Sequence, residues 1–258
     1  MLKRILILSI IILFTIQARC HDSREDKREK QLQSLLVWVW AINQPQFTIS
    51  PCIEYMKPLN IAYGQSEYWP RFHNDNKQYN TIIRGNSTMD ISCRYDNFLS
   101  DTTQCVAVGG NTLCDMETQR PAINTTNPYA IVISSGGGND IIQMVTNERD
   151  ITEAQIVNNG KYLIDQTRSE FPGAKIVFIP VHPTLESALN AVTPAINSNL
   201  EVYVNSLSNT CVVDIMGIFG KTAGDMADES QMLDSIHYNI TMAFSVKSAI
   251  GNDCGVNL

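Results

Sequence analysis

Residues 129–140, YAIVISSGGGND, decide the fold class of this chain. The segment begins as a short, nearly continuous apolar run rich in β-branched residues, which predicts a strand buried on both faces. Three consecutive glycines end this run, and an Asn-Asp pair follows them. Polar residues directly after a buried strand are typical of α/β proteins, in which chemistry gathers at the carboxyl ends of parallel strands.

Similar short apolar runs recur on both sides of this segment and alternate with helical stretches. We predict helices over 152–170, 184–207 and 240–250; Pro194 should kink or split the second, and Gly251 should end the third. This rhythm predicts a three-layer α/β/α sandwich with a central, mainly parallel, flavodoxin-like sheet of five strands. The predicted strands are residues 60–63, 79–84, 129–135, 175–181 and 211–215.

The rest of the chain divides by composition. Residues 1–20 carry Lys3 and Arg4 before an apolar run of twelve residues, which predicts a cleaved secretory signal peptide; an uncleaved signal anchor is the alternative. Residues 21–50 form an N-terminal extension, and residues 51–258 form the main domain. Within that domain, residues 86–128 hold three cysteines and many Gly, Asn and Thr, and we expect an irregular, disulfide-tied insertion there.

Cysteine parity and glycosylation sequons agree with secretion. Cleavage after Cys20 leaves six of the seven cysteines, an even number that favours disulfides outside the cell. Six cysteines allow fifteen pairings; two of the pairs that we consider are Cys105 with Cys114 and Cys211 with Cys254. Chance matches are the alternative reading of the three Asn-x-Ser/Thr sequons, at Asn86, Asn124 and Asn239.

Charge and residue counts exclude some function classes. The formal net charge is −7, with a sequence pI of about 5.1, so the chain lacks the basic surface that binds a nucleic-acid backbone. Four histidines and scattered cysteines without a C-x-x-C pair argue against a dedicated zinc fold. We therefore expect no metal site and no nucleic-acid partner.

Four polar blocks follow predicted strands in a specific order. They are Gly64-Gln65-Ser66, Gly85, Gly138-Asn139-Asp140, and Asp234-Ser235-Ile236-His237. This set resembles the SGNH hydrolases, also called the GDSL esterase/lipase family, which are named for Ser, Gly, Asn and His in four such blocks. The resemblance covers about residues 58–250, and it is the order of the four blocks on an α/β pattern that makes it specific.

The resemblance implies a role for each block. Ser66 would be the nucleophile, His237 the base that takes its proton, and Asp234 the group that orients the imidazole. The backbone N–H groups of Ser66 and Gly85 and the side-chain amide of Asn139 would form the oxyanion hole. No metal or cofactor is needed for this chemistry.

One residue departs from the family pattern. The family usually has Asp before the nucleophile, where this chain has Gln65. A Gly-Gln-Ser block resembles that of sialate O-acetylesterase-like carbohydrate esterases, which favours removal of acetyl groups from sugars. Trp69 and His182 are candidate substrate contacts, although a core aromatic and a structural histidine are the alternative readings.

We therefore expect a secreted serine esterase that hydrolyses short-chain or acetyl esters, including esters on carbohydrate, through an acyl-serine intermediate. Its partner would be a small-molecule or glycan ester, with no stable membrane insertion after signal cleavage. Two alternatives stay open: an acyltransferase that uses the same residues, and a catalytically silent glycan-binding module on the same fold.

Overall fold

A computed structural model describes residues 79–123, 127–134 and 136–258, and these residues belong to one compact unit. Within them, five strands form one parallel sheet in the order β2-β1-β3-β4-β5. The predicted α/β class and parallel sheet are therefore confirmed. The strands are β1 (Thr81–Arg84), β2 (Thr103–Cys105), β3 (Ala130–Ser134), β4 (Lys175–Ile179) and β5 (Thr210–Val212).

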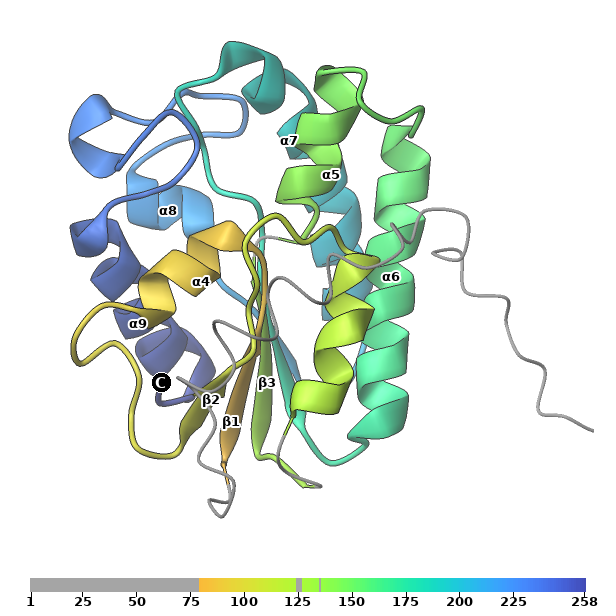
Figure 1. The fold of residues 1–258 in the computed structure, drawn as a ribbon, viewed down its shortest axis with the longest axis vertical. Helices are drawn as coiled ribbons and strands as arrows, with labels where there is room; N and C mark the ends of the chain where they lie inside the picture. The colour runs from red at the N-terminus through yellow and green to blue at the C-terminus, as the bar shows by residue number, and fades with distance from the viewer. Residues whose placement is uncertain (1–78, 124–126, 135) are drawn as a thin grey trace, which may run out of the picture. The chain divides into compact units, whose positions relative to one another are not determined.

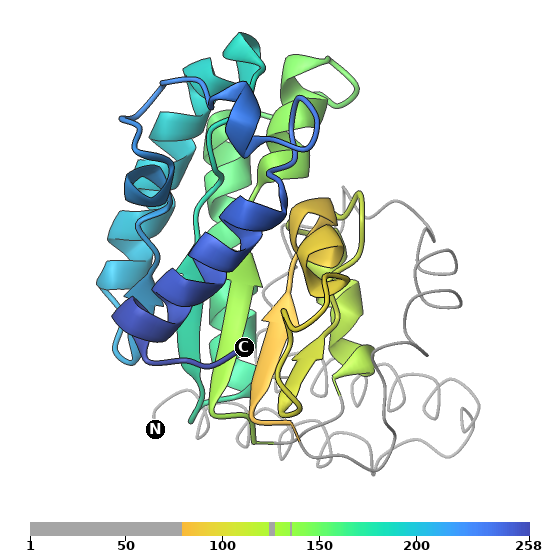
Figure 2. The ribbon, with the colours of Figure 1, turned by 90° about the vertical axis from the view of Figure 1, so that its left-hand side faces the viewer.

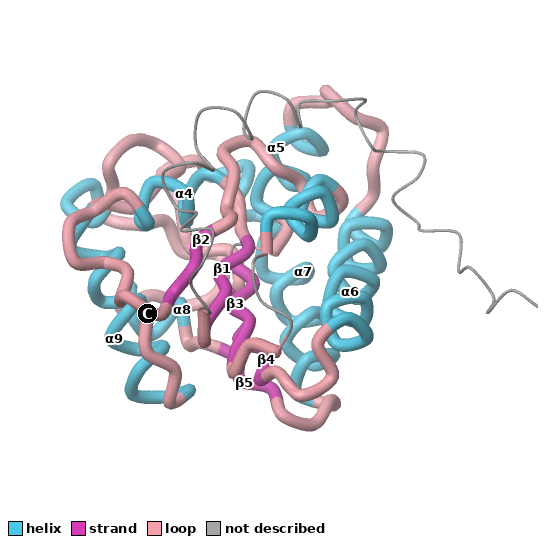
Figure 3. Tube along the Cα trace, turned by 60° about the horizontal axis from the view of Figure 1, so that its bottom comes forward, coloured by secondary structure: helices cyan, strands magenta, loops and turns pink. Residues whose placement is uncertain are grey.

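Helices cover both faces of the sheet, as Figures 1 and 3 show. Alternate residues of β3 point to opposite faces: Ile131 and Ile133 belong to one apolar core, and Val132 belongs to the other. The first core packs under α5 (Gly138–Val145), α6 (Glu153–Glu170) and α7 (Ser187–Asn205). The second packs under α4 (Ser87–Cys93), α8 (Ile215–Phe219) and α9 (Ile240–Cys254), and α9 is seen against the sheet in Figure 2.

The described part of the predicted insertion, residues 86–123 and 127–128, contains regular elements of the sheet domain and is not irregular, although a disulfide does tie it. They supply α4, the edge strand β2, and the 3-10 helix η2 (Asp115–Ala122). Strand β2 pairs in parallel with β1 from Thr81↔Thr103 to Ile83↔Cys105. The sheet thus takes its fifth described strand from this region, and the strand predicted at 60–63 lies outside the described residues.

The predicted helices are present, with two corrections. Helix α7 runs through Pro194 as one element, so the predicted split is absent, while a kink at Pro194 stays a prediction. Helix α9 runs through Gly251 to Cys254 and ends at Gly255, whose φ of 66° is the left-handed conformation of a helix C-cap. A second 3-10 helix, η3 (Glu229–Gln231), precedes the residues of the last polar block.

Two disulfides join elements of the described chain. Cys211 of β5 pairs with Cys254 of α9, which confirms that expected pair. Cys105 of β2 pairs with Cys93 at the end of α4, so the expected pair of Cys105 with Cys114 is wrong. The reason is local: α4 packs beside β2, whereas Cys114 is bonded elsewhere in a disulfide of its own.

The chain leaves β1 and β3 toward opposite faces of the sheet. After β1 it enters α4 on one face and returns to β2, and after β3 it enters α5 on the other face on its way to β4. A crevice opens at the carboxyl ends of neighbouring strands where such a switch occurs. No helix among the described residues is long and apolar enough to cross a membrane.

Candidate active site

Ser87 is placed at the carboxyl end of β1 as the first residue of α4. Asn86 caps this helix: its backbone is extended, and its side-chain oxygen accepts a hydrogen bond from the Thr88 N–H at 3.2 Å. Gly85 lets the start of α4 pack closely on the strand end, because a Cβ on it would lie 3.0 Å from the Cβ of Met89. The strand, the turn and the cap together present the Ser87 hydroxyl at the crevice.

Asp234 and His237 form a tight turn after η3. One carboxylate oxygen of Asp234 accepts the backbone N–H groups of Ile236 at 2.9 Å and His237 at 2.7 Å. The other oxygen lies 2.8 Å from Nδ1 of the His237 ring. Partial burial opposes ionisation of Asp234, but these hydrogen bonds outweigh it and hold the pKa of the carboxyl below its usual value.

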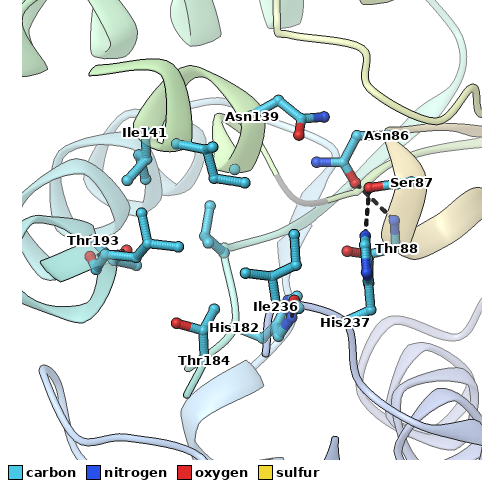
Figure 4. Close-up of a pocket in the computed structure, with 14 residues that line it drawn as sticks. Asn86, Ser87, Thr88, Asn139, Ile141, His182, Thr184, Thr193, Ile236 and His237 are labelled. Carbon is cyan, nitrogen blue, oxygen red and sulfur yellow. Dashed lines mark hydrogen bonds between the residues drawn. The ribbon is translucent and has the colours of Figure 1, made fainter. Parts of the chain in front are cut away.

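The turn brings His237 against Ser87, although the two residues are 150 positions apart (Figure 4). Nε2 of His237 lies 2.7 Å from Oγ of Ser87. An ionised carboxylate only accepts, so Nδ1 carries the ring proton and Nε2 is the acceptor for the Ser87 hydroxyl. Ser87, His237 and Asp234 are thus linked in one continuous chain of hydrogen bonds, and the His237 side chain is 16% exposed.

Asn139 reaches the same crevice from α5 and lies beside Asn86 and Ser87 (Figure 4). The glycines before it are required by geometry: a Cβ on Gly136 would lie 2.5 Å from the Phe178 ring, and Gly137 has a φ of 106°. The Asn139 amide donates one hydrogen bond, to the Asn111 carbonyl at 2.8 Å. An NH₂ group has two hydrogens, so a second remains for a ligand.

A small pocket, partly open to solvent, lies beside these groups. Ser87, Asn139 and His237 contribute polar groups to it, and the remaining lining combines aliphatic side chains with further polar ones from Asn86, Thr88, His182, Thr184 and Thr193. A concave apolar site with a few convergent polar groups is the usual form of a small-molecule site. The apolar wall consists of Ile141, Ile142, Val181, Leu189 and Ile236.

Three residues proposed from the sequence lie outside the described residues: Ser66, Gln65 and Trp69. Of the others, the structure brings Asn139, Asp234 and His237 to one site. The serine that it places there is Ser87, which the sequence analysis considered only as part of a glycosylation sequon. The signal for it was present, since Gly85-Asn86-Ser87 follows a predicted strand directly and repeats the spacing of Gly64-Gln65-Ser66.

Gly85 does not act as the expected oxyanion donor. Its N–H donates to Oε1 of the buried Gln119 at 3.2 Å, and its carbonyl accepts from Nε2 of the same side chain at 2.7 Å. The glycine that borders Ser87 comes instead from the loop after β2. A Cβ on Gly109 would lie 3.8 Å from that of Ser87, and the Gly109 N–H donates to Asp90.

His182 lines the pocket wall but is anchored in the structure. Its Nε2 lies 2.8 Å from the Ile236 carbonyl, and the whole residue is only 3% exposed. Burial lowers the pKa of its ring to about 4, so the ring is neutral at neutral pH.

The sequons differ in their surroundings. Asn86 is 3% exposed and lies inside the site, so glycosylation there conflicts with the fold. Asn239 caps α9 and donates to the Ser230 carbonyl at 2.7 Å, and its modification stays a prediction. Asn124 lies outside the described residues.

Among the described residues, no three His, Cys, Asp or Glu side chains group in a way that could hold a metal ion. No protein-family model matches the chain, and no curated protein matches it in sequence. Similarity appears at the level of three-dimensional structure.

Three solved structures illustrate this similarity. A protein provisionally assigned as a platelet activating factor from Streptococcus pneumoniae has a TM-score of 0.61 at 14% identity, covering 86% of this chain and 98% of its own. A GDSL-like lipase from Bacteroides thetaiotaomicron has a TM-score of 0.55 at 16% identity, covering 66% and 83%. An acetylxylan esterase from Geobacillus stearothermophilus has a TM-score of 0.53 at 11% identity, covering 70% and 96%.

Sequence identities this low show a shared fold but not a shared activity. The parallel sheet, the flanking helices and these neighbours agree with the resemblance drawn from the strand-end residues. The chain has the fold of the SGNH, or GDSL-type, hydrolases.

Proposed function

We propose that this protein is a serine esterase with Ser87 as its nucleophile. The observation that carries the proposal is the chain of contacts from Ser87 Oγ to His237 Nε2 at 2.7 Å and from His237 Nδ1 to Asp234 at 2.8 Å. A serine hydroxyl is a weak nucleophile until an adjacent base takes its proton, and this arrangement supplies that base and its orienting carboxylate. The esterase and lipase neighbours support the same reaction class.

The reaction would proceed in two halves. Oγ of Ser87 attacks the ester carbonyl carbon while its proton passes to Nε2 of His237. The tetrahedral intermediate then collapses, the carbon–oxygen bond to the alcohol breaks, and the alcohol leaves with the proton from His237. Water repeats these steps on the acyl-serine, which releases the acid and restores both side chains.

The negative oxygen of the intermediate needs donors that are already in place. Ser87 is the first residue of its helix, so its N–H has no partner within the helix. The free hydrogen of the Asn139 amide is the second donor. We assign the third place to the loop after β2, where Gly109 borders Ser87, in place of Gly85. Removal of one such donor typically lowers turnover by ~100–1000-fold.

The pocket favours a small acyl group. Ile141 of α5 and Thr193 of α7 lie on the side of the pocket away from Ser87 (Figure 4), and the aliphatic side chains of Ile142 and Leu189 also line it. An acetyl or other short acyl chain fits such an enclosure, and one neighbour in fold acts on acetylated xylan. We propose acetyl esters on carbohydrate as the substrate class. The two disulfides support export from the cytosol.

Paired serine variants test the proposal on the full chain produced by secretion. Ser87→Ala should abolish hydrolysis of p-nitrophenyl acetate and of acetylated xylo-oligosaccharides, whereas Ser66→Ala should leave it within about threefold. A fluorophosphonate probe should label the wild type and Ser66→Ala but not Ser87→Ala.

The opposite pattern, with activity lost only in Ser66→Ala, would show that Ser66 and not Ser87 is the nucleophile. Hydrolysis that survives in Ser87→Ala would remove Ser87 from the mechanism. A wild type inactive on every ester, but able to bind acetylated glycans, would identify a silent binding module.

A further inference from the structure

The loop between β4 and α7 is held by two buried asparagines of α7. Asn197 accepts from the Val181 N–H at 3.0 Å and donates to the Val181 carbonyl at 2.8 Å. Seven residues earlier, Asn190 makes the same pair of bonds to Thr184, at 3.0 and 2.8 Å. Both asparagines are less than 7% exposed, so these bonds are shielded from water and fix the loop backbone at two points.

The same loop contacts the turn that carries His237. Nε2 of His182 lies 2.8 Å from the Ile236 carbonyl, and the Leu185 N–H donates to the Ser235 carbonyl at 2.9 Å. A carbonyl only accepts, so Nε2 of His182 carries its ring proton. The ring packs on Phe219 at a centroid distance of 5.8 Å and against Tyr238 at 4.9 Å, which leaves it little freedom to rotate.

The bond from His182 acts on a single peptide group. The Ile236 carbonyl and the His237 N–H belong to the same planar unit, because a peptide bond does not rotate freely. His182 holds the carbonyl end at 2.8 Å, and Asp234 holds the N–H end at 2.7 Å. The orientation of this plane determines where the His237 side chain leaves the backbone.

From this geometry we propose that His182 is a positioning residue, which holds the Ile236–His237 peptide so that the His237 ring meets Ser87. The proposal rests on the esterase function proposed above. Asn190 and Asn197 of α7 hold the loop, and the loop holds the Ile236–His237 peptide through His182. Helix α7 therefore supports the position of His237, although the helix covers the opposite face of the sheet. The Nδ1 atom of His182 has no hydrogen-bond partner within the described residues, so the bond from Nε2 to the Ile236 carbonyl is the hydrogen bond that the ring makes there.

Kinetic constants separate this role from a substrate contact. His182→Phe keeps an aromatic ring between Phe219 and Tyr238 but removes the donor. His182→Gln gives up the ring but places an N–H near the position of Nε2. We expect His182→Phe to lower kcat by about 10- to 100-fold with KM within twofold, and His182→Gln to recover most of kcat. A substrate-contacting histidine would instead raise KM in both variants.

A second variant tests the support from α7. Asn190→Ser removes the amide clamp on Thr184 without touching the His182 ring, and it should lower kcat by a smaller factor, again with KM unchanged. This variant provides the readout if His182→Phe does not fold, as judged by circular dichroism and thermal unfolding. Unchanged kcat in Asn190→Ser would then count against the proposal.

The outcomes also distinguish this proposal from the one on which it rests. If Ser87→Ala is inactive and folded His182→Phe keeps full kcat, the positioning role is wrong and the esterase stands. A His182→Gln variant as slow as His182→Phe would likewise overturn it. If Ser87→Ala remains active, the esterase proposal itself fails.

Discussion

If Ser87 is the nucleophile, as proposed above, Asn86 stands where the SGNH pattern usually has an aspartate before its serine. In this chain the side chain caps α4 through its oxygen, a role that asparagine and aspartate fill equally well. The substitution therefore leaves the placement of Ser87 intact. It also removes a negative charge from a buried position beside the crevice, where an unpaired carboxylate would be costly.

Asp234 should determine turnover more than binding. Asp234→Asn keeps the shape of the turn but lets the side chain donate, which favours the wrong tautomer of His237. We expect kcat to fall by ~10³–10⁴-fold with KM changed only a few-fold. Steady-state kinetics on p-nitrophenyl acetate measures this.

Asp225→Asn serves as the matched control, because it removes the same charge from an exposed turn at Thr222. It should retain wild-type kcat. Equal losses in both variants would mean that overall charge, and not the bond to His237, controls the rate.

The sequence singled out three of the four residues that meet at the candidate site, and the reason lies in their neighbours. Asn139 follows a long apolar strand, and Asp234 and His237 lie within one turn of each other, so local spacing marks them. Choosing between Ser66 and Ser87 required long-range information, because both follow a Gly-x step after an apolar segment. Only the approach of His237 across 150 residues favours Ser87.

At the scale of elements, the disulfides divide into one near the site and one away from it. Cys93–Cys105 joins the end of α4 to β2. Helix α4 begins at Ser87, and the loop after β2 contains Gly109, so both elements border the crevice. Cys211–Cys254 joins β5 to the far end of α9. The sequence separations are 12 and 43 residues, so chain entropy favours the second as the larger stabiliser.

Replacing both cysteines of a disulfide by alanine should therefore affect stability and kcat to different degrees in the two cases. The Cys93→Ala/Cys105→Ala variant should lose about 3 kcal/mol of unfolding free energy and also a measurable part of kcat. The Cys211→Ala/Cys254→Ala variant should lose about 4 kcal/mol but keep its kcat at temperatures where it is folded. Urea unfolding and kinetics on the same samples test this. Equal kcat in the two variants would show that the α4–β2 bond does not support the site.

Element prediction succeeded where the pattern was strong. Strands β3 and β4 are runs of buried β-branched and aromatic residues, and α6 begins with a complete capping box at Thr152, so their limits are close to those predicted. Strand β2 is only Thr-Gln-Cys, buried by its neighbours and not marked by hydrophobicity. Its pairing with β1 is a tertiary effect that no local pattern contains.

For the whole molecule, one buried acid links proton binding to folding. Asp140 is fully buried, and Oδ2 of its carboxylate accepts the Leu113 N–H at 2.8 Å. Burial raises the pKa of this carboxyl from 3.8 to about 7, against the opposing effects of the Leu113 bond and Arg149. Between these values the folded state binds more protons than the unfolded state. The stabilising contribution is therefore complete below pH 4 and is lost as pH rises through about 7.

Asp140→Asn should remove this part of the pH dependence. Between pH 5 and pH 8, we expect the wild type to lose about 2–3 kcal/mol more unfolding free energy than the variant. Urea unfolding at both pH values measures the difference. Parallel curves for the two proteins would show that Asp140 has the same pKa in the folded and unfolded chain.

The separation of the pocket between two faces of the sheet has a consequence for how such an enzyme diversifies. Ser87 and His237 come from one face, whereas Ile142 and Leu189 come from helices that cover the other. Substitutions at Ile142 and Leu189 should therefore change which acyl groups the pocket accepts, while Ser87, His237 and Asp234 keep their positions. A mutant library confined to Ile142 and Leu189 should therefore change acyl selectivity with little loss of turnover, because it leaves Asn139 of α5 and the loop-holding Asn190 and Asn197 of α7 unchanged.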